Sequence, residues 1–549
     1  MPIDRRTAMR GRTGRGAAAA FLASVGVATT ACATSGSGGA TAADGVLTYA
    51  TNGIVQCLDP QAAASKLTAV IDRNLFDSLV AVSGDGEVRP WLAERWTVSK
   101  DGRTYTFTLR QGVVFHDGTP LTADAVKATL DHAVDPRTRS LYASSLLGAY
   151  AGTRVVDDRT VEIRLSRPHS PLLESLSTPY LGIQSARALR DKTAGPCTKP
   201  VGSGPFKFAS WTKGSSISLT KNPAYRWAPQ GSANPGPAHL AGVTFRLVPE
   251  DTARYGALTS GQAHLIDDVP AANVTALQRS KEHRYLRRDV PGAVLNIMFN
   301  ATRAPLDDER VRRALRQSID LDQLVKSIYA GQYARAWSPL SPATPGYDPK
   351  VAGSWRYDPA TAGRLLDEAG WTGRDSAGYR TRAGRRLTVR WPVGSRLIRR
   401  KDALLAQGIQ ADAKKAGIEI QYIPEDTGAF IRDVTTRNLD FYFEDFRTSS
   451  PDVLRYLYGS DQFPARGGSN VFHLRDARLD GWLQRAVATT DRAAQRDAYQ
   501  AAQRHLVERA YVLPIYVPAE LLGMSRKVRG LGFDPSVYLL FHDARLDGS

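Results

Sequence analysis

Hydrophobic residues along this chain of 549 residues repeat with two different periods. Residues 103–109 alternate, with Tyr105, Phe107 and Leu109 on one face and threonines on the other, which predicts a half-buried strand. Residues 67–79 instead place apolar side chains three and four positions apart, which predicts an amphipathic helix. The apolar positions of that helix are Leu67, Val70, Ile71, Leu75 and Leu79.

The same two patterns continue to the C-terminus. A strand is expected at residues 46–50, and a second alternating unit at 201–220. A helix that begins after Thr122 is expected to bury Val126, Leu130, Ala133 and Val134, and another at 307–328 runs from Asp307 to Ile328. Further helices are expected at 360–369, 399–416, 479–489 and 492–510, and short strands at 418–423, 439–443 and 512–517. This mixture predicts an α/β fold, and the chain is long enough for two or three lobes.

The N-terminal 44 residues have the pattern of an export and anchoring segment. Five arginines precede an apolar, small-residue stretch at 17–31, which is the order of a secretory signal peptide and is too short to span a bilayer as a resident helix. Cys32 follows Thr29-Thr30-Ala31 and resembles the lipidated cysteine of a bacterial lipobox. We therefore expect a signal peptide at 1–31, a diacylated Cys32 and a flexible tether at 32–44, which would hold the protein on the outer face of the cell membrane. The alternative is an ordinary signal peptide with an incidental cysteine, and the Sec and twin-arginine export routes are both open.

The positive charge does not indicate a nucleic-acid partner. The formal net charge is +18, but the arginines are spread along the whole chain, without a basic block or a basic-aromatic module. A basic surface close to anionic lipid is the preferred interpretation.

If Cys32 is lipidated, two cysteines are left. In an oxidising compartment Cys57 and Cys197 are expected to form a disulfide. The alternative is two separate buried thiols.

Sequence motifs for catalysis and for metal binding are missing. There is no phosphate-binding G-x-x-x-x-G-K-[ST] loop, no H-E-x-x-H and no G-x-S-x-G, and the nine histidines are scattered. The adjacent acids Asp267-Asp268 and Glu444-Asp445 would point to opposite faces of a strand, which argues against paired acid–base work. Neither an enzyme nor a cofactor or metal site is expected.

Several sequence blocks resemble those of one known family. Three runs come first, at 92–96 (LAERW), 101–107 (DGRTYTF) and 112–124 (GVVFHDGTPLTAD). Four more blocks follow in order, at 200–206 (PVGSGPF), 249–267, 295–315 and 357–371. Together they resemble the oligopeptide- and dipeptide-type substrate-binding proteins of ABC transporters, which are family 5, or cluster C, of the solute-binding proteins. The similarity covers essentially the whole chain after the tether.

The resemblance implies a fold and a way of working. The fold would be a two-lobe clam-shell of the type II periplasmic-binding-protein kind, with lobe I at 45–295 and 512–549 and lobe II at 296–511. An extra subdomain would be inserted in lobe I at about 81–198. A monomer would trap a peptide or peptide-like solute between the lobes by hinge closure and deliver it to an ABC permease, while a separate ATPase subunit hydrolyses ATP.

The resemblance also implies the position of the solute site. In peptide-binding relatives, an aspartate in a W-x-A-D-Y segment pairs with the α-ammonium of the peptide. Here Phe446 takes the tryptophan position and Ser449 the aspartate position, with Asp445, Arg447 and Thr448 beside them. A serine cannot supply the charge-assisted bond, and Arg447 would repel an ammonium, so we expect a solute that need not carry a free α-amine and can be acidic. Other candidate ligand-binding residues are Thr51, Asn52 and Gly53 in the loop after the first strand, and Arg335 and Trp337.

Three alternatives stay open at this point. The solute could be a nickel chelate, an oligosaccharide or another non-peptide molecule. The same fold could also serve a sensory receptor or a hydrolase.

Overall fold

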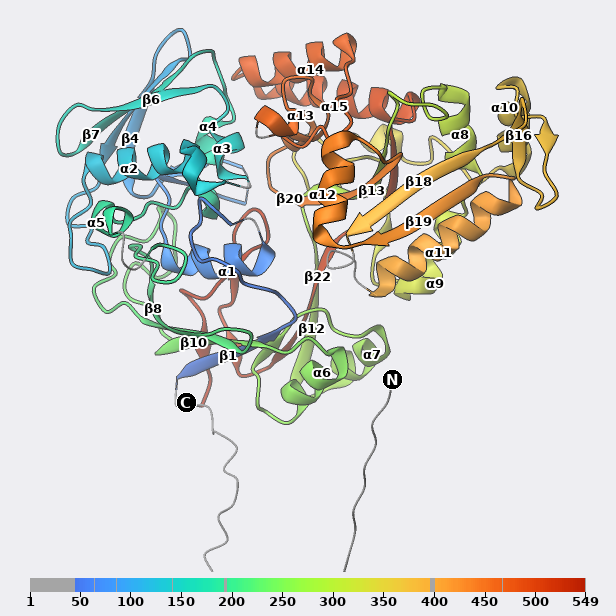
Figure 1. Ribbon diagram of the computed structural model, residues 1–549. Coiled ribbons are helices and arrows are strands. Elements are labelled where there is room, and N and C mark those ends of the chain that lie inside the picture. Colours follow the sequence, from blue (N-terminus) through green and yellow to red (C-terminus); the bar gives the residue numbers. More distant parts are fainter. Residues whose placement is uncertain are drawn as a thin grey trace, which may run out of the picture. The chain divides into compact units, whose positions relative to one another are not determined.

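The structure is a computed structural model and describes residues 45–63, 65–84, 86–140, 142–191, 195–394, 400–466 and 468–548. The expected signal peptide, Cys32 and the tether lie outside these residues. Within them, helices pack against several separate sheets in two lobes, as the α/β pattern predicts (Figure 1).

A seven-stranded sheet forms the base of lobe I, in the order β12-β22-β11-β1-β10-β9-β8. β1 (Val46–Thr51) is the expected first strand and pairs in parallel with β10 (Gly242–Leu247) and β11 (Leu265–Ile266). The other strands are β8 (Phe206–Thr212), β9 (Ser216–Lys221), β12 (His283–Asp289) and β22 (Ala519–Ser525), and the nearby helices are α1 (Lys66–Leu75), α6 (Asp251–Thr259) and α7 (Ala271–Arg279).

A second, antiparallel sheet lies in the segment expected to be an insertion. Its order is β4 (Ala93–Val98), β5 (Thr104–Leu109), β7 (Thr160–Leu165) and β6 (Tyr150–Val155). β5 buries Tyr105, Phe107 and Leu109, which confirms the alternating pattern. The same segment holds β2 (Val80–Val82), β3 (Val88–Pro90), α2 (Ala123–Val134), α3 (Ala143–Leu146), α4 (Leu172–Ser175) and α5 (Ala186–Arg190).

The expected burial of Val134 is wrong. Val134 is the last residue of α2 and is 39% exposed, whereas Val126, Leu130 and Ala133 are buried. The helix ends at Asp135, so Val134 lies beyond the core residues against which the rest of this helix face packs.

Lobe II is built around a four-stranded sheet in the order β14-β21-β13-β20. These strands are β14 (Ala334–Arg335), β21 (Val512–Val517), β13 (Gly292–Phe299) and β20 (Phe441–Arg447), and β18 (Thr388–Gly394) and β19 (Glu419–Glu425) form a parallel pair beside them. The surrounding helices are α10 (Pro359–Glu368), α11 (Arg400–Lys415), α12 (Thr427–Thr436), α13 (Val453–Tyr458), α14 (Ala477–Ala488) and α15 (Arg492–Glu508). Most of its buried hydrophobic residues form two clusters apart from the main cluster of lobe I, and Phe446 and Tyr456 pack against the lobe I cluster.

The single helix predicted at 307–328 is two helices, and the prediction is wrong at this point. α8 (Glu309–Gln317) and α9 (Leu321–Tyr329) are separated at residues 318–320. Asp320 is the N-cap of α9 and accepts a hydrogen bond from the Gln323 N–H at 3.0 Å. The apolar spacing hid this break because both helices bury residues in the same core of lobe II.

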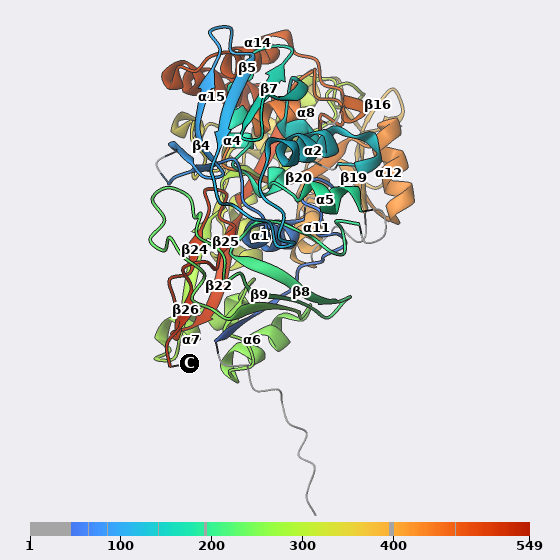
Figure 2. The ribbon, with the colours of Figure 1, turned by 90° about the vertical axis from the view of Figure 1, so that its left-hand side faces the viewer.

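Two crossing connections join the lobes. The chain passes from β12 to β13 through Val290-Pro291 and returns from β21 to β22 through Pro518, and the Val290 N–H donates to the Pro518 carbonyl at 2.8 Å. In both views β22 runs from lobe II toward the base of lobe I (Figures 1 and 2). β13 and β21 on the far side of these connections belong to the four-stranded sheet of lobe II, and β12 and β22 to the seven-stranded sheet of lobe I.

Cys57 and Cys197 form the expected disulfide, with their Cα atoms 4.3 Å apart. The bond links the loop after β1 to the segment just before β8. Across the described residues, every helix falls short of the length and apolarity that crossing a membrane requires.

Candidate solute-binding site

Charged side chains of both lobes meet beside the crossing strands. Arg447, the last residue of β20, forms an ion pair with Glu520 of β22. Glu520 Oε1 also lies 3.0 Å from Lys66 Nζ, and Lys66 Nζ lies 3.5 Å from Asp267 Oδ2. We call these four residues the ionic cluster. It connects the lobes, because Arg447 belongs to lobe II and the other three residues to lobe I.

The local structure explains why these side chains converge. Lys66 is the first residue of α1, whose N-cap Ser65 accepts a hydrogen bond from the Thr68 N–H at 3.2 Å. Asp267 directly follows β11, and Glu520 is the second residue of β22, just after the crossing residue Pro518. Each of the four residues therefore lies at or next to one end of a helix or strand, and these ends meet where the two lobes face each other.

The end of β1 and the first residue after it hold Asp267 and its neighbour Asp268. Thr51 Oγ1 donates a hydrogen bond to Asp267 Oδ2 at 2.8 Å, and Tyr49 OH donates to the same oxygen at 3.1 Å. Asn52 Nδ2 donates to Asp268 Oδ2 at 2.7 Å. These carboxylates lie at the carboxyl ends of the parallel strands β1 and β11, the edge at which α/β proteins bind ligands.

Three members of the ionic cluster are shielded from water, whereas the Lys66 side chain is 36% exposed. The side chains of Glu520 and Asp267 are 2% and 1% exposed, and that of Arg447 is 15% exposed. Burial alone would raise the pKa of Glu520, but the charges of Arg447 and Lys66 hold that pKa below its ordinary value. Burial would likewise lower the pKa of Lys66, but Glu520 and Asp267 raise it. Glu520, Lys66 and Arg447 are therefore charged at neutral pH.

An aromatic cluster crosses the interface next to these charges. The ring of Tyr142, from the inserted segment, lies 4.5 Å from that of Phe446 and 5.4 Å from that of Tyr456, both in lobe II. It also lies 5.1 Å from the ring of Tyr180 in the same inserted segment, and the Thr448 side chain hydrogen-bonds to Tyr142. Edge-on and tilted aromatic pairs of this kind favour contact between the lobes.

Two adjacent acids of β20 have different surroundings. Asp445 is exposed, whereas burial, together with the charge of Asp445, raises the pKa of Glu444 to about 8. Tyr442, on the same side of the strand as Glu444, hydrogen-bonds to it. Glu444 therefore carries a proton at neutral pH.

Replacing Glu444 by glutamine should flatten the pH dependence of stability. The folded-state pKa of about 8 lies above the ordinary 4.5, so the protonated carboxyl stabilises the fold fully below pH 4.5, and this contribution is lost as the pH rises through 8. Urea unfolding of both proteins at several pH values in this window measures the effect. Glu282→Gln, at an exposed position, is the control. A Glu444→Gln variant with the same slope as the wild type would show that Glu444 does not titrate in this way.

The structure brings together only part of the predicted site. Thr51, Asn52, Phe446, Arg447 and Thr448 lie in or next to the ionic and aromatic clusters. Gly53 packs on α1, and a Cβ atom there would lie 2.7 Å from Leu67.

Arg335 and Trp337 lie within lobe II instead. The Arg335 guanidinium stacks over Trp337 and Trp355 at 4.6 Å and donates to the carbonyl of Pro514 at 2.7 Å. These are contacts typical of a packed protein interior.

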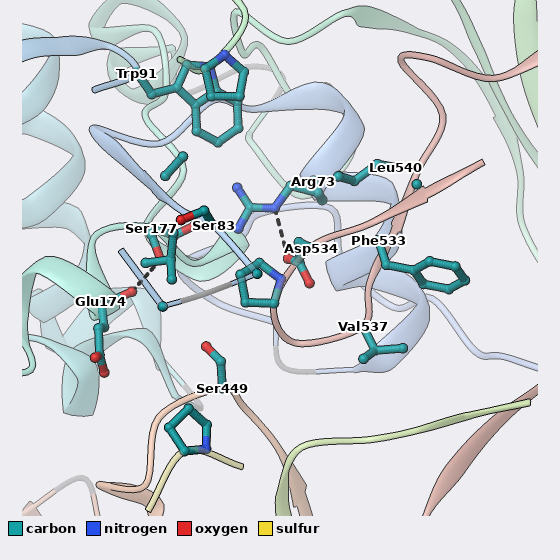
Figure 3. A pocket seen from close by; sticks show the side chains of 18 of the residues that line it. Arg73, Ser83, Trp91, Glu174, Ser177, Ser449, Phe533, Asp534, Val537 and Leu540 are labelled. Carbon is teal, nitrogen blue, oxygen red and sulfur yellow. Dashed lines mark hydrogen bonds and ion pairs between the residues drawn. The ribbon is translucent and has the colours of Figure 1, made fainter. Parts of the chain in front are cut away.

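Ser449 faces a cavity of about 850 Å³ (Figure 3). Residues of both lobes line this cavity, among them Arg73 and Trp91 of lobe I, and Ser449 and Tyr499 of lobe II. A hairpin turn near the C-terminus separates the cavity from Arg447, because Val537 lines the cavity while its carbonyl accepts a hydrogen bond from Arg447 Nη1 at 3.1 Å.

Sequence reasoning missed Lys66, Glu520 and Tyr142. Glu520 carried a signal, since it is the only charged residue in the apolar run at 511–524, and a lone charge in a buried strand is normally paired. Lys66 and Tyr142 carried none. In the part of the chain that the structure describes, no group of three or more His, Cys, Asp or Glu side chains is arranged to hold a metal ion.

The chain belongs to a known family. Residues 87–464 match the family described as bacterial extracellular solute-binding proteins, family 5 Middle. The protein is therefore an extracellular solute-binding protein, as the sequence motifs predict.

Individual relatives agree with this assignment. The glutathione-binding protein GsiB of Escherichia coli (strain K12) is 28% identical over 503 residues, which cover 89% of this chain and 92% of GsiB. NikA from Brucella suis, solved with Fe(III)-EDTA, superposes with a TM-score of 0.79 at 24% identity, covering 92% of this chain and 100% of NikA. DppA from Helicobacter pylori, solved with the peptide STSA, gives a TM-score of 0.75 at 24% identity and covers 92% of this chain and 98% of DppA. These structures confirm the two-lobe fold.

Proposed function

We propose that this protein is the solute-binding component of an ABC importer and holds a peptide or peptide-like solute between its lobes. An ABC permease would receive the solute, and ATPase subunits would drive its passage. The sequence blocks of the family and the relatives that bind peptides or glutathione support this proposal.

One observation carries the position of the site. The Arg447–Glu520 ion pair crosses from lobe II to lobe I, with Lys66, Asp267 and the aromatic ring of Tyr142 beside it. A solute bound here touches both lobes at once, and only such contacts favour closure.

Two further contacts between the inserted segment and lobe II support hinge closure. Arg167 Nη2 lies 2.9 Å from Asp461 Oδ2, and the Ser170 N–H donates to the Val487 carbonyl at 2.8 Å. Both join the insertion to lobe II at a distance from the ionic cluster.

The charges of the site favour a solute with a carboxylate. Arg447 is one of the cations that lobe II presents at the interface, and Ser449 supplies no negative charge for an ammonium. A planar guanidinium binds carboxylates with two parallel hydrogen bonds, so a solute carboxylate can share Arg447 with Glu520. We infer an acidic or C-terminally free peptide-like solute whose α-amine is not required.

Isothermal titration with four ligands tests this inference. They are a free tripeptide, its N-acetylated form, its C-terminal amide, and glutathione. We expect N-acetylation to change the Kd little and amidation to weaken binding by about tenfold or more, because a hydrogen-bonded charge is lost. Binding that requires the free amine and tolerates the amide contradicts the inference. Selective binding of a non-peptide chelate would favour the other candidate solute class.

We further propose that Cys32 is diacylated after removal of residues 1–31, and that residues 32–44 tether the protein to the outer face of the membrane. The extracellular family and the order of charged and apolar residues before Cys32 support this anchor.

A further inference from the structure

A hairpin turn near the C-terminus lies beside Arg447 and contacts α1, the inserted segment and lobe II. Residues 534–538, which we call the C-terminal turn, join β24 (Gly532–Phe533) to β25 (Leu539–Leu540). The Asp534 carboxylate accepts hydrogen bonds from the Ser536 and Tyr538 N–H groups, both at 2.9 Å, and its backbone carbonyl accepts from the Val537 N–H at 2.8 Å. The turn is thus organised by its own first residue.

Contacts from three directions hold the turn. Arg73 of α1 donates from Nε to Asp534 Oδ2 at 3.2 Å, with both side chains almost fully buried. Tyr180 of the inserted segment places its hydroxyl 2.7 Å from that of Tyr538. From lobe II, the Ser449 N–H donates to Ser536 Oγ at 3.1 Å.

The turn also contacts Arg447 in two ways. Arg447 Nη1 donates to the Val537 carbonyl at 3.1 Å, and its guanidinium lies 5.2 Å from the centre of the Tyr538 ring. Together with Glu520, these groups fix the plane of the guanidinium. A cation over an aromatic ring and a hydrogen bond to a carbonyl both depend on that plane.

Val537 adopts an unfavourable backbone conformation to make this contact. Its φ is 63°, in the left-handed region that β-branched residues rarely adopt. Such outliers persist where the surroundings fix them, and they concentrate at functional sites. On its far side the turn borders the cavity of about 850 Å³, which Asp534, Pro535 and Val537 line (Figure 3). Discrete polar contacts, rather than close packing on that side, therefore set the position of the turn.

We propose that the C-terminal turn is a positioning element that orients Arg447 to bind the carboxylate of the solute, with Val537 and Tyr538 as its positioning residues. This proposal rests on the proposed function of the ionic cluster. It adds that the specificity of Arg447 for a carboxylate depends on residues that do not themselves bind the solute.

A pair of substitutions at Val537 tests the proposal. Val537→Pro forbids a positive φ and turns the carbonyl away from Arg447, whereas Val537→Gly allows the same conformation. The readout is the ratio of the Kd of the tripeptide amide to that of the free tripeptide. We expect a wild-type ratio of about ten or more to fall to about one in Val537→Pro and to be retained in Val537→Gly, because only the proline removes the hydrogen bond to the charged group.

A second pair covers the case in which the proline variant does not fold. Tyr538→Leu removes the ring beneath Arg447, whereas Tyr538→Phe keeps the ring and removes the hydroxyl. We expect the ratio to fall in the leucine variant and to be kept in the phenylalanine variant. A purely structural role would weaken both ligands equally or lower the fraction of active protein, and would leave the ratio unchanged.

The outcomes separate this proposal from the one on which it rests. A selective wild type whose Val537→Pro and Tyr538→Leu variants are equally selective overturns the role of the turn alone. A wild type that binds the amide as tightly as the free tripeptide overturns the carboxylate site itself, and the positioning role with it.

Discussion

Replacing Arg447 by methionine should raise the Kd for a carboxylate-bearing solute by about 30-fold or more, since truncation of one partner of a buried, hydrogen-bonded charge pair costs about 2–5 kcal/mol. Methionine keeps much of the side-chain volume and removes the charge. Titration calorimetry with the free tripeptide measures the change. Arg529→Met is the matched control, because Arg529 is about half exposed and pairs with Asp547 at the surface of lobe I. Wild-type affinity in the Arg447→Met protein would remove Arg447 from the site.

The same substitution should also reduce stability. It leaves Glu520 buried with Lys66 as its remaining partner. Loss of one member of a buried pair costs about 3–5 kcal/mol, and Lys66 should keep the effect near the lower end of that range. A double variant, Arg447→Met with Glu520→Gln, removes the uncompensated charge and should recover most of the stability without recovering binding. Recovery of binding in the double variant would mean that the solute does not use the Arg447 charge.

Removal of the disulfide should have the largest effect on stability. Cys57 and Cys197 are 140 residues apart, and a loop of that length is stabilised by about 4–5 kcal/mol on the chain-entropy account. The double variant Cys57→Ser, Cys197→Ser should therefore unfold at a clearly lower urea concentration. Solute binding well below the unfolding transition should be retained, because neither cysteine belongs to the ionic cluster.

Reduction of the wild-type protein provides the control for that experiment. A reducing agent should shift the unfolding curve of the wild type to that of the double serine variant and leave the variant itself unchanged. A shift of less than about 1 kcal/mol in the variant would indicate that contacts of Leu58, whose N–H donates to the Cys197 carbonyl at 3.0 Å, hold these segments together without the bond.

The sequence predicts the fold well where patterns are local. The alternation of Tyr105, Phe107 and Leu109 and the family blocks from residue 92 onward lead to the correct strand, class and architecture. The sequence pattern does not reveal the break between α8 and α9, because Asp320 caps a new helix while the apolar spacing continues through it.

The site was less predictable because its contacts join distant parts of the chain. Glu520 pairs with Lys66 and Arg447, which are far away in sequence, and no local pattern specifies those pairs. Arg335 is the reverse case, because the sequence predicts it in the site and the structure places it elsewhere. It was expected in the cleft as a residue near a strand end, but its guanidinium lies over the rings of Trp337 and Trp355, which pack against each other inside lobe II.

The central claim is that the lobes close on a solute held at the ionic cluster. Spin labels at Val98→Cys in the inserted sheet and Ile431→Cys in lobe II, both exposed positions, report the separation of the lobes in a chain that also carries Cys32→Ser. Pulsed electron paramagnetic resonance with and without saturating free tripeptide gives the distance distribution. We predict that the solute converts a broad distribution into a single shorter distance, and that Arg447→Met abolishes this change. An unchanged distribution in wild-type protein that calorimetry shows to be saturated would contradict the claim.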